Sequence, residues 1–148
     1  MGSDQFWYFV KYKPNIKTAL RELREREFMA GRYFPAIDDP ISLLPITDKS
    51  PAFKPKHRSM KAAREDADGC TRSIVDLDHI SDEPEDYAIT PLDEDTILEI
   101  YGAQQPTHAM VEQDMSFFGL IGGCQGVYLI VYKDGKPDEI LFAGIAFD

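Results

Sequence analysis

The chain has 148 residues, of which 43% are hydrophobic and 11% aromatic, and it carries a formal net charge of −10. A chain of this length is expected to form a single domain, residues 1–148, and its apolar content excludes an intrinsically disordered protein. It contains no run of ~18 apolar residues that could cross a membrane, and no basic N-terminal segment of a secretory signal. We therefore expect a cytoplasmic protein that does not bind membranes.

The first predicted elements are a strand and a helix. Residues 6–13 are mostly aromatic or β-branched and contain no glycine or proline, which favours a strand. Pro14 ends this strand, and Asn15 is suited to cap a helix whose apolar residues recur at helical spacing, namely Ile16, Ala19, Leu20 and Leu23. Gly31 can adopt the left-handed conformation that ends many helices, so a helix is predicted over residues 15–30.

Residues 32–58 are predicted to form a long irregular segment. Prolines recur every few residues, at positions 35, 40, 45, 51 and 55, and each removes a hydrogen-bond donor and disfavours helix in the preceding residue. Loops longer than ~12–15 residues are uncommon in compact domains and are often functional. Because the segment also contains many large apolar side chains, we expect it to pack along the surface of the domain.

Four elements are predicted in the middle of the chain: a helix over 59–69, a strand over 72–80, a helix over 90–102 and a helix over 107–122. Ser59, Thr90 and Thr107 are suited to cap the three helices. Residues 87–90 are either a short strand or the entry to the helix that Thr90 would cap. Glycines at the far ends of these ranges are typical helix stops.

The last part of the chain is predicted to form a β-hairpin. Residues 126–132 and 139–147 are apolar and β-prone, and Asp134-Gly135 between them is a strong turn signal. Both strands are apolar on both faces, so we expect them to be central strands of a covered sheet. The order of elements predicts an α+β fold, in which about four helices pack on a mostly antiparallel sheet.

The charge is distributed unevenly along the chain. Residues 1–64 contain 13 Lys/Arg and 7 Asp/Glu, whereas residues 65–148 contain 3 Lys/Arg and 19 Asp/Glu. An acidic surface repels nucleic acid and favours a basic protein partner. The simpler interpretation is that the two halves neutralise each other, although each exposed ion pair would contribute only ~0–1 kcal/mol.

Two segments form the candidate binding surface. Arg32, Tyr33 and Phe34 combine a cation with aromatic rings, which are residue types enriched at interface hot spots. An acidic turn contributes four carboxylates, those of Asp82, Glu83, Glu85 and Asp86. The alternative for the first segment is structural: its aromatic rings pack in the core, and Arg32 pairs with an acidic residue of the other half.

A second candidate site consists of His57, Asp76, Asp78 and His79. Such side chains can act as acids, bases or metal ligands where the fold brings them together. On a strand, Asp76 and Asp78 would point to one face and His79 to the other. If the intervening Val75 and Leu77 face the core, the two carboxylates are simply solvated. We predict no metal site and no cofactor.

We predict a noncatalytic protein that binds a basic protein partner through acidic surface near residues 65–99. Its size and charge are similar to those of small inhibitor and immunity proteins, which is a likeness of composition and not of motif. The alternative is a small enzyme, or a ligand- or metal-binding protein, with a site between residues 32–58 and the sheet. A third possibility is self-association through the first strand, provided that this strand lies at a sheet edge.

Overall fold

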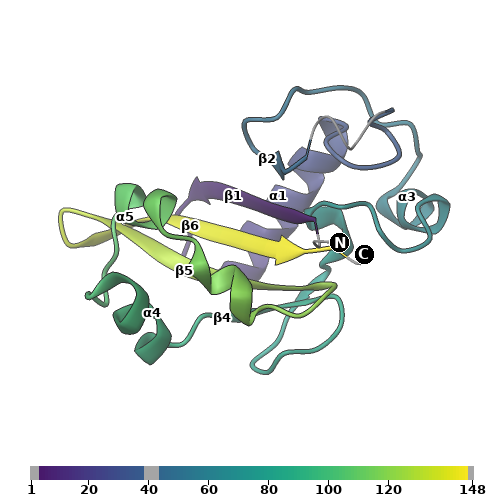
Figure 1. Cartoon of the computed structure of the whole chain (residues 1–148). Coiled ribbons are helices and arrows are strands. Elements are labelled where there is room, and N and C mark those ends of the chain that lie inside the picture. Colours follow the sequence, from purple (N-terminus) through teal and green to yellow (C-terminus); the bar gives the residue numbers. More distant parts are fainter. Residues whose placement is uncertain (1–3, 39–43, 147–148) are drawn as a thin grey trace.

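The computed structural model describes residues 4–38 and 44–146, and a six-stranded mixed sheet forms the centre of this part of the chain (Figure 1). The strand order is β2-β1-β6-β5-β4-β3. The bounds are Gln5–Lys11 for β1, Ile46–Thr47 for β2, His79–Ile80 for β3, Ala88–Pro91 for β4, Gln125–Lys133 for β5 and Lys136–Ile145 for β6. Together with the helices that cover it, this sheet confirms the predicted α+β class.

The pairing of the strands differs between the middle and the outside of the sheet. β6 pairs antiparallel with both β1 and β5, in the two longest ladders. Short parallel ladders join β2 to β1, β4 to β5 and β3 to β4. The prediction of a mostly antiparallel sheet is therefore right for the three long strands and wrong for the outer ones, which are too short to leave a clear period in the sequence.

The C-terminal hairpin lies at the centre of the sheet, as predicted. Asp134 and Gly135 form a two-residue turn with φ of +53° and +75°, the positive angles that such a turn requires. The two faces of β5 and β6 belong to separate apolar clusters, one on each side of the sheet. The second strand was expected to reach residue 147, which lies outside the described residues.

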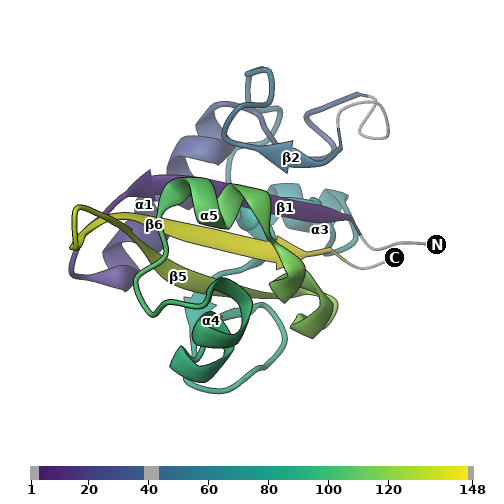
Figure 2. The ribbon, with the colours of Figure 1, turned by 60° about the vertical axis from the view of Figure 1, so that its left-hand side comes forward.

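Helices cover the two faces of the sheet (Figures 1 and 2). α1 (Ile16–Met29) packs on the face that carries Phe6, whereas α5 (His108–Gln113) and the 3-10 helix η2 (Ser116–Leu120) pack on the face that carries Leu129. The sheet therefore divides the core into two apolar layers, as expected for strands that are apolar on both sides.

α1 confirms the predicted helix over 15–30. The Asn15 side chain accepts a hydrogen bond from the Thr18 N–H at 3.1 Å, which caps the first turn. Gly31 follows the helix with φ of +67°, and a Cβ there would lie 2.8 Å from backbone atoms of Lys54. Glycine is thus needed at this position both for its backbone angle and for the close approach of the next segment.

α3 (Met60–Asp66) and α4 (Glu94–Tyr101) lie at opposite ends of the molecule (Figure 1). Ser59 caps α3 as predicted. Of the two alternatives for residues 87–90, the short strand is right, because Thr90 belongs to β4. The cap at Thr90 is wrong, since the Asp93 side chain caps α4 and accepts from the Thr96 N–H at 2.8 Å. None of the described helices has the length and apolar character needed to span a bilayer.

Two further predictions are wrong because short polar side chains bond to the nearby backbone. Instead of a strand over 72–80, Ser73 caps a 3-10 helix, η1 (Ile74–Asp76), and only His79–Ile80 forms a strand. The helix expected over 107–122 stops at Gln113, since the Asp114 side chain accepts from the Ser116 N–H at 3.0 Å and η2 follows.

Residues 32–58 pack against the domain, as predicted, wherever the structure describes them. Tyr33, Ile37 and Ile46 of this segment are fully buried, and its residues 39–43 lie outside the described part. β2 belongs to this segment and pairs with the start of β1. β1 therefore lies between β2 and β6, and β2 covers the outer edge of β1 only at Phe6 and Trp7. Self-association through the rest of that edge stays a prediction.

Candidate functional site

The Arg32 side chain points into the molecule and forms a bidentate ion pair with Glu27. Arg32 Nε donates to Glu27 Oε1 at 2.7 Å, and Arg32 Nη2 donates to Oε2 at 2.9 Å. Glu27 is 0% exposed. Its hydrogen bonds with Arg32 raise the pKa of that guanidinium. The partner of Arg32 therefore lies on α1 and not in the acidic half, and the sequence did not indicate it, because carboxylates are rarely buried.

Tyr33 and Phe34 also make internal contacts. Tyr33 is 0% exposed, stacks on Phe28 with 5.3 Å between ring centroids, and shares a 2.8 Å hydrogen bond between its hydroxyl and His57 Nδ1. The Arg72 guanidinium lies 5.6 Å from the centroid of the Phe34 ring. These contacts correspond to the structural alternative for this segment, in which its side chains hold the fold together.

The four residues of the second candidate site do not form one cluster. His57 Nε2 lies 2.9 Å from Asp66 Oδ2. Asp78 Oδ1 lies 2.6 Å from His79 Nδ1, and neither of these two residues contacts His57 or Asp76. Of the four candidates, the structure brings together only Asp78 and His79.

Asp76 is 1% exposed, and the expectation of a solvated carboxylate is wrong. Because η1 replaces a strand here, the side chain points inward, and its Oδ1 accepts from the N–H and the hydroxyl of Thr71 at 2.9 and 2.7 Å. Oδ2 is buried without a partner. Burial raises the pKa of Asp76, although the hydrogen bonds from Thr71 oppose the shift. This carboxyl group holds the turn over residues 71–76 together.

Asp78 and His79 belong to a charged cluster that also contains Arg64 and Glu85. Asp78 Oδ2 accepts from Arg64 Nη1 at 2.9 Å, and His79 Nε2 lies 3.3 Å from Glu85 Oε1. The hydrogen bond with Asp78 raises the pKa of His79, and Glu85 adds to this shift. Partial burial raises the pKa of Asp78, but the hydrogen bonds from His79 and Arg64 outweigh it and the net shift is downward. The cluster joins the basic and acidic halves of the chain at one place.

A cavity of about 650 Å³ opens beside this cluster, and its lining includes Asp78. Arg24 of α1 and Met60 of α3 form part of its walls. The Arg64 guanidinium lies 5.1 Å from the centroid of the Tyr87 ring, which also lines the cavity. The cavity thus combines apolar and aromatic walls with charged groups of both signs.

The acidic turn precedes β4 and α4 follows it, and both segments lie on the β4 side of the sheet (Figures 1 and 2). Their carboxylate residues are exposed. We call this surface the acidic face, and it comprises Asp82, Glu83, Glu85, Asp86, Asp93, Glu94, Asp95 and Glu99. Apart from the contact of Glu85 with His79, none of these carboxylates lies within 4.0 Å of a lysine, arginine or histidine nitrogen in the described residues.

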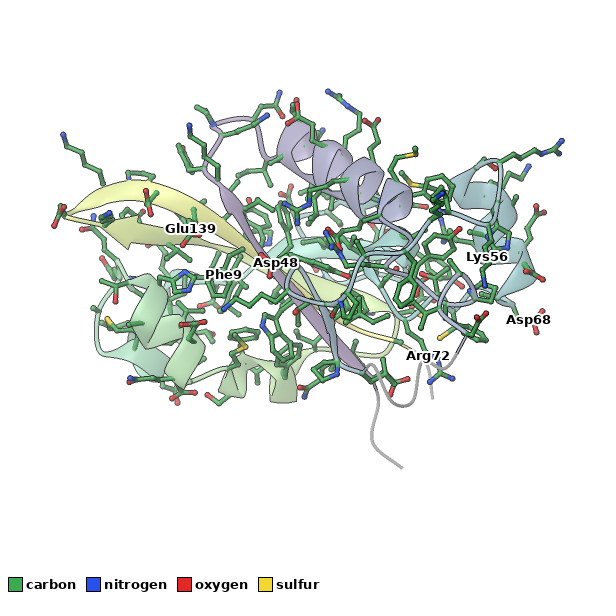
Figure 3. The ribbon with its side chains drawn as sticks, turned by 90° about the horizontal axis from the view of Figure 1, so that it is seen from above. Phe9, Asp48, Lys56, Asp68, Arg72 and Glu139 are labelled. Atoms are coloured by element: carbon green, nitrogen blue, oxygen red, sulfur yellow. The ribbon has the colours of Figure 1, made fainter. Side chains whose placement is uncertain are left out.

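In the described residues, the basic residues of the first half reach the acidic face only through the cluster in which Arg64 pairs with Asp78, and His79 contacts both Asp78 and Glu85. Lys56 pairs with Asp38, and Arg64 pairs with Asp78. Seen from above, Lys56 lies at the end of the molecule opposite to Glu139 (Figure 3), and α3, which follows Lys56, lies opposite to α4 (Figure 1). Within the described residues, neutralisation between the two halves is therefore confined to a few pairs, and the carboxylates of the acidic face other than Glu85 have no ion-pair partner.

Apolar side chains are exposed beside these carboxylates. None of the residues of α4 is fully buried. Leu98 of α4 is 45% exposed and Leu120 of η2 is 68% exposed, and a groove of about 460 Å³ between the two helices is lined by Leu120, Glu99 and Asp114. The sequence predicted a helix here but not the groove, because η2 is distant from α4 in the chain.

In the described ranges, no three His, Cys, Asp or Glu side chains are grouped closely enough to hold a metal ion. The chain matches no protein-family model, no curated protein and no solved structure. The features of the described residues that bear on function are therefore the acidic face, the exposed Leu98 and Leu120, and the cavity.

Proposed function

We propose that this protein is a noncatalytic binding module that engages a basic protein partner through the acidic face. The observation that carries the proposal is the absence of compensating cations: seven of the eight carboxylates of the face have no ion-pair partner in the described residues. Grouped like charges repel one another and create a field that attracts an oppositely charged partner. A basic surface would relieve this repulsion on binding.

The exposed leucines support a protein as the partner. Charged rims steer association and fix orientation, whereas most of the affinity of an interface comes from apolar groups that become desolvated at its centre. Leu98 and Leu120 are the large apolar side chains that α4 and η2 leave exposed, and they lie beside Glu99 and the other carboxylates of α4. A partner with basic residues around an apolar patch is complementary to this arrangement.

The test uses charge-neutral variants with a matched control. In the first variant, Glu94→Gln, Asp95→Asn and Glu99→Gln remove three charges from the acidic face. In the control, Glu25→Gln, Asp134→Asn and Asp138→Asn remove three exposed charges elsewhere. Crosslinking and pull-down are carried out at low and high salt, because exposed charges are screened beyond a Debye length of about 8 Å at physiological ionic strength.

We expect the wild type and the control to recover the same salt-sensitive partner, and the acidic-face variant to lose it. The proposal fails if no salt-sensitive partner is recovered, or if both variants lose the partner equally, since the second result would reflect net charge alone.

A second candidate function is the binding of a small ligand, with or without turnover, in the cavity between α1 and α3. Its volume of about 650 Å³ lies in the range of about 300–1,000 Å³ that is typical of small-molecule sites. Arg24 in its wall has no carboxylate of the described residues within ion-pair distance and donates to the carbonyl of Val75 at 2.7 Å. A panel of nucleotides, metabolites and divalent metals tests this by thermal unfolding, since a ligand at 100 times its Kd adds about 2.7 kcal/mol. The absence of any shift would count against it.

A further inference from the structure

A small hollow lies on the inner side of α4, between this helix and β5. It has a volume of about 260 Å³, and its lining includes Tyr128, Ile130 and Tyr132 of β5, Glu94 and Ile97 of α4, and Gln104. This volume is below the range of about 300–1,000 Å³ that is typical of sites for whole ligands. It suits a single long side chain.

The hollow coincides with a gap in the hydrogen bonding of β5. The β4 ladder ends at Pro91, after which the Leu92 N–H donates to the Tyr128 carbonyl at 2.9 Å. The next bond on this edge joins the Tyr132 N–H to the Pro106 carbonyl at 2.8 Å. Alternate residues of a strand present their N–H and C=O to the same edge, so Ile130 faces the gap.

The backbone of Ile130 has no partner on this edge among the described residues. Its register partner in β6, Ile140, lies on the opposite side of the strand. One free residue is too short for a partner strand to add to the sheet, a mode of binding that uses a run of main-chain hydrogen bonds. The gap therefore offers a single carbonyl acceptor and a single N–H donor at the floor of the hollow.

The charges around the hollow favour a cation. Glu94 lines it, whereas no lysine or arginine does. Burial raises the pKa of Tyr128, and the negative charge of Asp82 adds to the shift. Carboxylates, a backbone carbonyl and tyrosine rings are groups that bind ammonium and guanidinium ions, while the apolar walls suit an alkyl chain.

We propose that this hollow is the specificity pocket of the acidic face and takes one lysine or arginine side chain of the basic partner. This inference rests on the proposed function and names the chemistry that is recognised. The alkyl chain lies along Ile97, and the charged end lies beside Glu94 and the Ile130 carbonyl.

Fragments of the two side chains test the pocket without the partner. Butylammonium and propylguanidinium are titrated against the ¹⁵N-labelled full chain, with butanol and butyrate as the neutral and anionic controls. We expect at least one cation to shift the Ile130 amide resonance and the ring signals of Tyr128 and Tyr132, and the controls not to do so. Shifts with neither cation, or equal shifts with butanol, would overturn the proposal.

Two single variants on the same helix separate the pocket from the general negative field. Glu94→Gln removes the carboxylate that lines the hollow, whereas Glu99→Gln removes one that lines the groove on the other side of α4. We expect Glu94→Gln to weaken cation binding at least threefold and Glu99→Gln to leave it unchanged. Equal weakening would show a nonspecific charge effect and would refute the pocket.

The outcomes also separate this inference from the proposed function. Recovery of a salt-sensitive partner together with no fragment binding refutes the pocket and leaves the acidic face as the binding surface. Fragment binding without any such partner supports the pocket and refutes the proposed protein interaction.

Discussion

Replacement of Glu27 by alanine tests whether the Arg32 corner holds the fold together. Glu27 is fully buried and accepts two hydrogen bonds from Arg32, so its removal leaves a guanidinium that has lost its counterion. Breaking a buried ion pair in this way costs about 3–5 kcal/mol. Arg32 keeps 13% exposure of its side chain and a 3.3 Å hydrogen bond to the Ser50 carbonyl, so we expect the lower end, about 3 kcal/mol.

Denaturant unfolding and thermal unfolding, both followed by circular dichroism, measure this loss of unfolding free energy. For a domain of about 150 residues, 1 kcal/mol shifts the melting temperature by about 2–4 °C, so a fall of about 6–12 °C is expected. Glu25→Ala, on the exposed side of the same helix, is the control and should stay within about 0.5 kcal/mol of the wild type. A loss below about 1 kcal/mol for Glu27→Ala would refute the reasoning and would reopen Arg32 as a contact residue.

Three further outcomes are expected. Because burial raises the pKa of Asp76, the folded state favours the protonated carboxyl, and the stability of the wild type falls as the pH rises from the usual pKa near 3.8 through the folded-state value. Denaturant unfolding at several pH values should show the stability of Asp76→Asn rising relative to that of the wild type over this window. Gly144→Ala should cost about 1–3 kcal/mol, since the new Cβ would meet aromatic carbons at 2.7 Å, whereas Gly119→Ala, with open space at its Cβ, should cost much less in the same assay. Partial burial lowers the pKa of His108, but Glu139 and Glu112 outweigh this effect and the net pKa is raised. The ion pairs of His108 therefore stabilise the fold below pH 6.5, and this contribution is lost as the pH rises through the folded-state pKa. His108→Gln should remove this pH dependence of stability, which is at most about 1 kcal/mol for exposed groups, and an unchanged pH profile would contradict the assignment.

The predicted candidate residues are of two kinds. Some are exposed whatever their neighbours are, whereas the positions of others depend on specific contacts. The charge of residues 82–86 predicts an exposed acidic turn, because charged side chains without partners stay in contact with solvent. The chemistry of Arg32, Tyr33 and Asp76 does not reveal what holds each of them. Arg32 pairs with a buried carboxylate of the preceding helix, Tyr33 bonds to a histidine 24 residues away, and Asp76 lies in an unexpected turn. Residue type indicates what a side chain can do, but not which neighbour it meets.

The sites that the sequence did not indicate are formed between elements. The hollow beside Tyr128 requires the end of the β4 ladder, the inner side of α4 and the bond of Tyr132 to Pro106. None of these segments carries a motif of its own. A gap in the bonding of a strand appears only when the partners on its edge are known.

The sequence by itself determined the local elements with strong periodic or turn signals, namely α1 with its Asn15 cap and the central hairpin with its Asp134-Gly135 turn. It also determined the acidic character of the second half, because charge is a property of composition. Only the tertiary structure decided the parallel pairing of β3 and β4, the burial of Glu27 and Asp76, and which carboxylates of the second half pair with basic residues of the first. These features depend on contacts between segments far apart in the chain, and the free energy of such contacts is not encoded in any local pattern.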